Sequence, residues 1–165
     1  MRAVAVFNKN VHGVVELYQH SPTHQTNIHF KLEGLIPLGM NACHIHTYGD
    51  MSDGCNSACD HYNPRGSRHG SIHIKTMGQD RHVGDLCNNL HGDFLGRCDF
   101  EYDDDLVDLH GPESVIGRMI VIHSGMDDLG IHRDTNSQRG RESSKTGNSG
   151  TRIACAVIGH AKFNP

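Results

Sequence analysis

Short segments in which apolar and polar residues alternate are the feature that most constrains the fold of this chain. The segment Asn27–Leu35 reads NIHFKLEGL, and its apolar and polar residues alternate up to Glu33. Successive side chains of a strand point to opposite faces, so this pattern predicts a strand with one buried face. Similar but shorter patterns predict further strands at residues 3–7, 14–18, 42–46, 94–100, 114–123 and 152–159.

Clusters of Gly, Pro, Asn and Asp separate these segments, and the chain contains 19 glycines and no tryptophan. Seven or eight short strands with turn signals between them are typical of an all-β sandwich or a Greek-key barrel. Because 165 residues are most simply one domain, we expect a single domain over residues 1–165.

Two segments, Gly49–Gly84 and Ser124–Gly150, interrupt the regular spacing of the strands. Both are rich in Gly, Ser, Asn, Asp and charged residues. Both are longer than ordinary connections between strands, and long loops on a rigid scaffold usually carry function. We therefore expect two functional loops.

Composition and charge exclude two broad classes of protein. The formal net charge of −4 lacks the basic excess of a nucleic-acid-binding protein. The apolar run Met119–Ile122 is far too short to span a membrane, and the beginning MRAVAVFNKN has no apolar signal region. These features predict a soluble, cytoplasmic protein, in which cysteines are ordinarily reduced thiols or metal ligands.

Histidine is the residue type most in excess, with fifteen in the chain. In the predicted strand of ACHIHTYGD, His44 and His46 point to the same face, which is the beginning of a metal site. His123 ends the apolar segment VIGRMIVIH and is well placed to complete that site, whose imidazoles suit copper or zinc. The first long loop and its end supply further candidate ligands, from which three histidines and an aspartate would suit Zn²⁺: His61, His69, His73, His82 and Asp85.

A series of motifs extends this pattern along the chain. In order, they read HIH, GCNSACDHYNP, RHG, RHVGDL, VIGRMIVIH, DDLG and SSKTGNSGTRIACAVIG. From about Ala3 to Ala161 the chain closely resembles the copper/zinc superoxide dismutases. The resemblance implies an eight-stranded Greek-key β-barrel, an immunoglobulin-like sandwich, with the active site on two long loops. It also implies a homodimer and, as a further partner, a copper chaperone.

The resemblance implies one copper and one zinc ion in each chain. The copper ligands would be His44, His46, His61 and His123. The zinc ligands would be His61, His69, His82 and Asp85, with His61 bridging the two metals. The stretch between His69 and His82 looks longer than the family pattern, so His73 is an alternative to His69, although the RHG motif favours His69.

Other residues of the motifs receive supporting roles by the same resemblance. Asp127, the first acid of DDLG, would accept hydrogen bonds from His44 and His69 and so fix their tautomers. Cys55 and Cys155 would form a disulfide between the first long loop and the last strand. The remaining cysteines are expected to be free: Cys43, Cys59, Cys87 and Cys98.

The implied activity is the conversion of superoxide to dioxygen and hydrogen peroxide by one-electron cycling of copper, with zinc in a structural role. His61 is expected to take up and return a proton during turnover. Arg152, in GTRIAC, would border the copper and dock the anion. Lys145 would add to the positive field that attracts superoxide, and Glu142 would shape it.

Two alternatives remain, because fold alone does not establish catalysis. The chain could be a non-catalytic copper/zinc-binding module on the same fold, or a structural β domain of an assembly. The full set of ligands and the docking arginine are present, which favours the enzyme. Two departures from the family pattern concern the longer second loop, with Arg133, Arg139 and Arg141, and His160 near the expected dimer contact.

Overall fold

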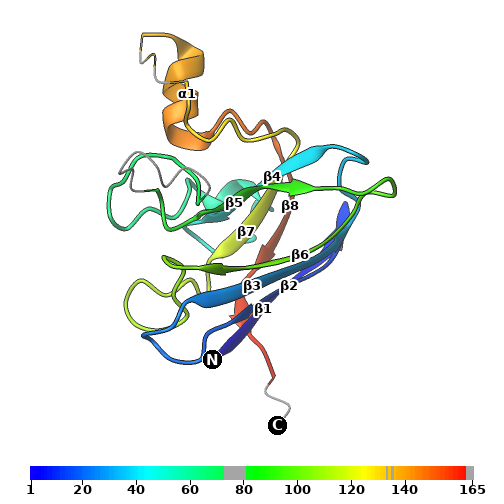
Figure 1. Ribbon diagram of the computed structural model, residues 1–165, viewed down its shortest axis with the longest axis vertical. Coiled ribbons are helices and arrows are strands. Elements are labelled where there is room, and N and C mark those ends of the chain that lie inside the picture. Colours follow the sequence, from blue (N-terminus) through cyan, green and yellow to red (C-terminus); the bar gives the residue numbers. More distant parts are fainter. Residues whose placement is uncertain (73–80, 133, 135, 163–165) are drawn as a thin grey trace.

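The computed structural model describes residues 1–72, 81–132, 134 and 136–162. His73 and Arg133, named above as an alternative zinc ligand and a loop cation, lie outside the described residues. Two antiparallel sheets face each other, and a helix stands beyond the end opposite the two chain termini (Figure 1). The predicted all-β fold is therefore confirmed.

The sheets contain five and four strands. The first has the order β6 (Arg97–Asp104), β3 (Thr26–Glu33), β2 (Val11–Tyr18), β1 (Arg2–Lys9) and β9 (Gly159–His160). The second has the order β5 (Asp85–His91), β4 (Met40–His46), β7 (Met119–His123) and β8 (Arg152–Val157). The chain crosses between the sheets after β3, β5, β6 and β8, so that β6 pairs with β3 and β7 with β4, as in a Greek key.

The alternation predicted for β3 is present in the structure. Ile28, Phe30 and Leu32 are buried between the sheets, whereas Lys31 is exposed and pairs with Glu16 of β2 at 2.8 Å. Apolar side chains from both sheets form one continuous core. The hydrophobic pattern of the sequence therefore determines which face of this strand is covered.

Strand β4 is buried on both faces, which is what positions the histidines. Cys43 and Ile45 point into the core between the sheets, and His44 and His46 occupy the opposite face. Because that face is also buried, the two imidazoles are shielded from solvent. Cys43 is thus a small core residue, as the alternation predicted.

The strands of the structure differ from the prediction in several places. Strand β5 was not predicted, because its sequence DLCNNLH contains two adjacent asparagines that resemble a turn. Strand β6 begins at Arg97, because Gly96 takes a positive φ of 73° in the preceding turn. Strand β7 begins only at Met119, because Gly117, with a φ of 80°, ends a turn before it.

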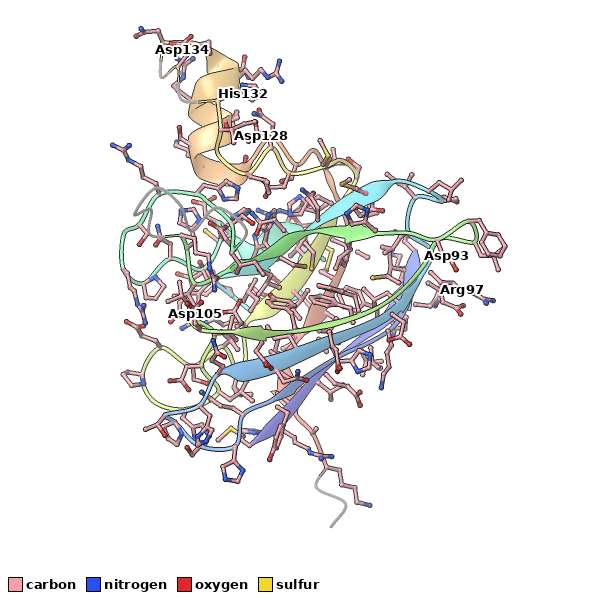
Figure 2. The ribbon with its side chains drawn as sticks, in the orientation of Figure 1. Asp93, Arg97, Asp105, Asp128, His132 and Asp134 are labelled. Atoms are coloured by element: carbon pink, nitrogen blue, oxygen red, sulfur yellow. A yellow bond between two sulfur atoms is a disulfide. The ribbon has the colours of Figure 1, made fainter. Side chains whose placement is uncertain are left out.

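The second long segment is not entirely loop, since it contains the helix α1 (Gln138–Thr146). Ser137 caps its N-terminus by accepting a hydrogen bond from Gly140 N, and Gly147 ends it with a left-handed φ of 65°. Asp128, which lies beside α1 in Figure 2, accepts a hydrogen bond from Ser143 Oγ at 2.8 Å. This segment was predicted as a functional loop, and the helix within it was not predicted, because its polar residues have no apolar stripe.

The disulfide between Cys55 and Cys155 is formed, and it links the first long loop to β8 across 100 residues of sequence. The four other cysteines are free, as expected: Cys43, Cys59, Cys87 and Cys98. A short 3₁₀ turn, η1 (Asn56–Ala58), follows Cys55. In the part of the chain that the structure describes, no helix has the length and apolar character needed to cross a membrane.

Candidate metal centre

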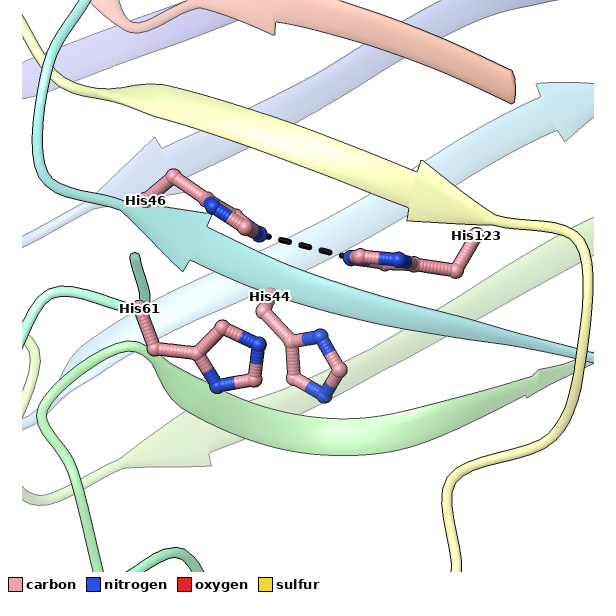
Figure 3. Close-up of side chains that lie close together, drawn as sticks. All are labelled: His44, His46, His61 and His123. Atoms are coloured by element: carbon pink, nitrogen blue, oxygen red, sulfur yellow. Dashed lines mark hydrogen bonds between the residues drawn. The ribbon is translucent and has the colours of Figure 1, made fainter. Parts of the chain in front are cut away.

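Among the described residues, three groups of buried side chains have ligand atoms within 4.8 Å of one another, and two of these groups have four members. The first consists of His44, His46, His61 and His123, shown in Figure 3. The second consists of His61, His69, His82 and Asp85. The structure therefore brings together the seven residues named as ligands from the sequence, with His61 shared between the groups.

Hydrogen bonds determine which nitrogen of His46 and His123 carries a lone pair. His46 Nδ1 donates to the carbonyl oxygen of Cys59 at 2.7 Å, and His123 Nδ1 donates to that of Gly150 at 3.4 Å. The remaining Nε2 atoms of both rings face each other at 3.3 Å (Figure 3). Two lone pairs at this distance repel unless a cation or a proton lies with them, so the pair fits a metal ion.

His44 and His61 each have one buried ring nitrogen without a partner. His44 Nε2 donates to Asp127 Oδ2 at 2.5 Å, and no described residue makes a hydrogen bond to its Nδ1. The same holds for Nε2 of His61, whose ring centroid lies 3.9 Å from that of His44. A buried polar atom left without a partner is costly. A metal ion held by both nitrogens would remove that cost.

The second group converges on the carboxylate of Asp85. The Nδ1 atoms of His61, His69 and His82 lie 3.0, 3.0 and 3.2 Å from Asp85 Oδ1. The main-chain nitrogens of Gly70 and His82 donate to Asp85 Oδ2, which fixes the carboxylate. Three imidazoles and one carboxylate are a ligand set that suits tetrahedral Zn²⁺.

Asp127 links the two groups through one buried carboxylate. Its Oδ2 accepts from His44 Nε2 at 2.5 Å, and its Oδ1 accepts from His69 Nε2 at 2.9 Å. Burial opposes its ionisation, but the hydrogen bonds from both rings hold the pKa of Asp127 well below its usual range. The Nδ1 atoms of both histidines are therefore the ones left for a metal.

The comparison with known proteins decides the family. The family model described as copper/zinc superoxide dismutase matches residues 11–158. The chain belongs to the copper/zinc superoxide dismutase family. The predicted enzyme class, an oxidoreductase, and the predicted cofactors, copper and zinc, are thereby confirmed.

Individual relatives match over nearly the whole chain. The superoxide dismutase [Cu-Zn] of Neurospora crassa is 44% identical over 161 residues, which are 96% of this chain and 97% of that protein. That of Paramecium bursaria Chlorella virus 1 is 41% identical over 162 residues, or 98% and 80% of the two chains. An extracellular superoxide dismutase [Cu-Zn] of Onchocerca volvulus is 42% identical over 162 residues, or 97% and 76%.

Burial favours the neutral form of the four histidines of the first group. Burial lowers the pKa of His44 to about 3 and that of His123 to about 4. Burial also lowers the pKa values of His46 and His61. Neutral imidazole is the form that binds a metal, so the protein interior prepares these rings as ligands.

His69, in the second group, behaves in the opposite way. Burial opposes its charge, but hydrogen bonds to Asp127 and Asp85 outweigh that effect and raise the pKa of His69 to about 10. The two carboxylates therefore require positive charge between them. A proton supplies it in the protein alone, and a zinc ion would supply it on binding.

Arg152 lies at the rim of the first group. It is half-buried, and its guanidinium donates to the carbonyl oxygens of Cys55 at 2.7 Å, Asn56 at 3.1 Å and Cys59. The Cys59 carbonyl also accepts from His46, so only one peptide group separates the arginine from a candidate copper ligand. The guanidinium of Arg152 thus lies beside the first ligand group.

Glu142 and Lys145 are exposed on α1, outside the two ligand groups. The helix is tied to the zinc side of the centre, because His69 N donates to the main-chain oxygen of Ser144 at 3.3 Å. The two charges are therefore fixed on an element that borders the centre.

Asparagine and arginine side chains that the sequence did not single out hold the ligands in place. Asn41 Nδ2 donates to the main-chain oxygen of His123 at 2.7 Å. Arg81 donates to the main-chain oxygen of Asp85 and pairs with Asp104 at 2.7 Å. The sequence gives only a weak signal for these supporting residues, because a polar residue in a segment that becomes buried cannot be recognised as buried from the sequence alone.

Proposed function

We propose that residues 1–165 form one superoxide dismutase domain in which the two ligand groups divide the metals between them. The observation that carries this proposal is the sharing of His61 between two buried groups that differ in composition. An all-imidazole group suits copper, and a group with a carboxylate suits zinc. Bound copper would supply one-electron redox chemistry, and bound zinc would supply fixed positive charge.

The free ring nitrogens support a specific assignment of ligand atoms. For copper these are Nδ1 of His44 and Nε2 of His46, His61 and His123. For zinc these are Nδ1 of His61, His69 and His82 with a carboxylate oxygen of Asp85. His44, His46, His69 and His123 then use their other ring nitrogen for a hydrogen bond, and His61 uses its other nitrogen for the second metal.

His61 and Arg152 are the proposed catalytic residues. His61 Nε2 is buried, without a hydrogen-bond partner in the described residues, and can hold a proton and return it to the reduced product. Arg152 would dock superoxide with its guanidinium N–H groups, since three carbonyl oxygens hold the group in place. Lys145 and Glu142 would shape the field along the approach of the anion.

The alternative is a copper/zinc-binding module without turnover. Storage of metal requires the ligand groups but gives no role to a guanidinium anchored beside them. The superoxide dismutation rate of protein loaded with both metals, followed as ionic strength rises, separates the two functions. A fast rate that falls with salt supports steered catalysis, and full metal loading without activity supports the module.

Replacing Arg152 with alanine is expected to lower the dismutation rate on the order of tenfold and to weaken its salt dependence. Both metals should stay bound, because Arg152 is not in either ligand group. Stopped-flow decay of superoxide measures the rate, and metal analysis measures the content. Arg97→Ala is the control, because it removes the same charge from the exposed face of β6 (Figure 2). An unchanged rate in Arg152→Ala would contradict the docking role.

We also propose that the protein is a homodimer, as is usual in the family. Exposed apolar side chains around the start of the first long loop, Tyr48 and Met51, provide surface for such a contact. His160, in β9, is exposed as well. Sedimentation velocity should give a mass close to twice 18.2 kDa, and a monomer at micromolar concentration would contradict the proposal.

A cytoplasmic location and delivery of copper by a chaperone are further proposals. Four free cysteines, of which Cys59 is exposed, fit a reducing compartment. Cell fractionation with an antibody to this chain tests the location. Copper content in cells with and without a candidate chaperone tests the delivery.

A further inference from the structure

The segment that leads from β7 into the second long loop is held against the second sheet at every other residue. Asn41 Nδ2 donates to the main-chain oxygen of His123, and Ala42 N donates to that of Gly125, each at 2.7 Å. The next residue in this series is Asp127, whose carboxylate links the two ligand groups. The main chain of Asp127 must be fixed in position, because its carboxylate accepts hydrogen bonds from the rings of both His44 and His69.

Asn89 of β5 makes that contact with both ends of its side-chain amide. Its Nδ2 donates to the main-chain oxygen of Asp127 at 2.9 Å, and Asp127 N donates to its Oδ1 at 2.8 Å. Within β5, Asn89 pairs with Ala42 of β4, two residues before His44. The amide therefore connects the strand next to the ligands with the residue that orients them.

Two bonds from one planar amide fix both the position and the direction of the Asp127 main chain. Asp127 is only 1% exposed, so its peptide groups cannot obtain these hydrogen bonds from bulk water. Without the Asn89 amide, two buried main-chain groups would lose their partners. The main chain would then shift, and the carboxylate would move with it.

We infer that Asn89 is a positioning residue for the metal centre, which acts through Asp127 on His44 and His69. The inference rests on the proposed function, in which Asp127 sets the tautomers of one ligand of each metal. It predicts that Asn89 affects metal binding more than it affects the stability of the metal-free fold. An apolar side chain is compatible with a strand, so replacing the amide of Asn89 with one should leave β5 intact.

The test compares Asn89→Leu with Asn27→Leu. Asn27, on β3, also donates a side-chain hydrogen bond across strands, to Asp103 Oδ1 at 3.0 Å, but it lies in the other sheet. Zinc affinity is measured by competition with a chelator, the copper environment by electron paramagnetic resonance after loading with Cu²⁺, and stability by thermal unfolding of the metal-free protein. Asn89→Leu should weaken zinc binding about tenfold and alter the Cu²⁺ spectrum, and Asn27→Leu should do neither.

Asp127→Asn distinguishes failure of this inference from failure of the proposed function. If Asp127→Asn weakens zinc binding and Asn89→Leu does not, the inference about Asn89 is overturned. If Asp127→Asn leaves zinc binding and the Cu²⁺ spectrum unchanged, the proposed role of Asp127 in the metal centre is wrong, and the inference about Asn89 is overturned with it. A drop in the unfolding temperature of metal-free Asn89→Leu far beyond that of Asn27→Leu would assign Asn89 a general structural role instead.

A second variant keeps the test valid if Asn89→Leu does not fold. Asn89→Asp retains an oxygen that can accept from Asp127 N, but it places a second oxygen against the main-chain oxygen of Asp127. Zinc binding should weaken in this variant too, because one of the two bonds becomes a repulsive contact. Unchanged zinc affinity in Asn89→Asp would contradict the role of Asn89 Nδ2 as a hydrogen-bond donor to the main-chain oxygen of Asp127.

Discussion

Replacing His123 with alanine is expected to abolish copper binding and dismutation while zinc remains bound. His123 belongs only to the first ligand group, whereas the zinc group shares no atom with it. The loss of this ring also removes the partner that faces His46 Nε2 at 3.3 Å. Copper affinity should fall by more than the roughly 10- to 100-fold that accompanies loss of residues that only support ligands.

Metal analysis after dialysis and the superoxide decay rate measure these two effects. His12→Ala is the control, because His12 is an exposed histidine of β2 outside the ligand groups. It should keep both metals and the full rate. Loss of zinc together with copper in His123→Ala would show that the ligands are divided differently.

Replacing Gly147 with alanine is expected to weaken the binding of both metals. A Cβ atom at Gly147 would lie 1.9 Å from Asp127 Oδ1 and 2.6 Å from His69 Nε2. These atoms form the link between the two groups, so they would have to move apart. Because Asp127 orients His44 as well as His69, zinc and copper affinity should each fall about tenfold or more.

Gly66→Ala provides a closely matched control. Gly147 and Gly66 both have a φ of 65°, so both variants incur the strain of a left-handed alanine, about 1 kcal/mol. No atom lies within 4 Å of a Cβ at Gly66. Chelator competition should therefore show normal metal affinity in Gly66→Ala. Equal affinities in the two variants would mean that the contact with Asp127 and His69 has no influence on the metals.

Much of the candidate site could be predicted from the sequence, because its ligands are mostly histidines and a chain with fifteen histidines is unusual without a metal site. His44 and His46 share a face through the strand period of two, and the structure places them together under the loops. The pairing of Cys55 with Cys155 rested on the family resemblance, and the structure contains it. His73 lies outside the described residues, so its role stays a prediction.

The supporting residues could not be predicted in the same way. Asn89 lies in a segment for which no strand was predicted, and only the packing of β5 against the second loop shows that its amide holds Asp127. The contact joins residues 38 apart in the sequence, and no local pattern encodes such a distance. The helix α1 was missed for a different reason, because its polar residues have no apolar stripe to mark a helix.

The sequence by itself determined the class of fold, the family and the set of metal-binding side chains. Those properties follow from local periodicity and from ordered motifs, which are readable residue by residue. Only the tertiary structure decided which ring nitrogens are free, how Asp127 joins His44 to His69, and where Arg152 lies relative to His46. These features depend on hydrogen bonds between segments distant in the chain, whose partners are chosen when the two sheets and the two long loops pack together.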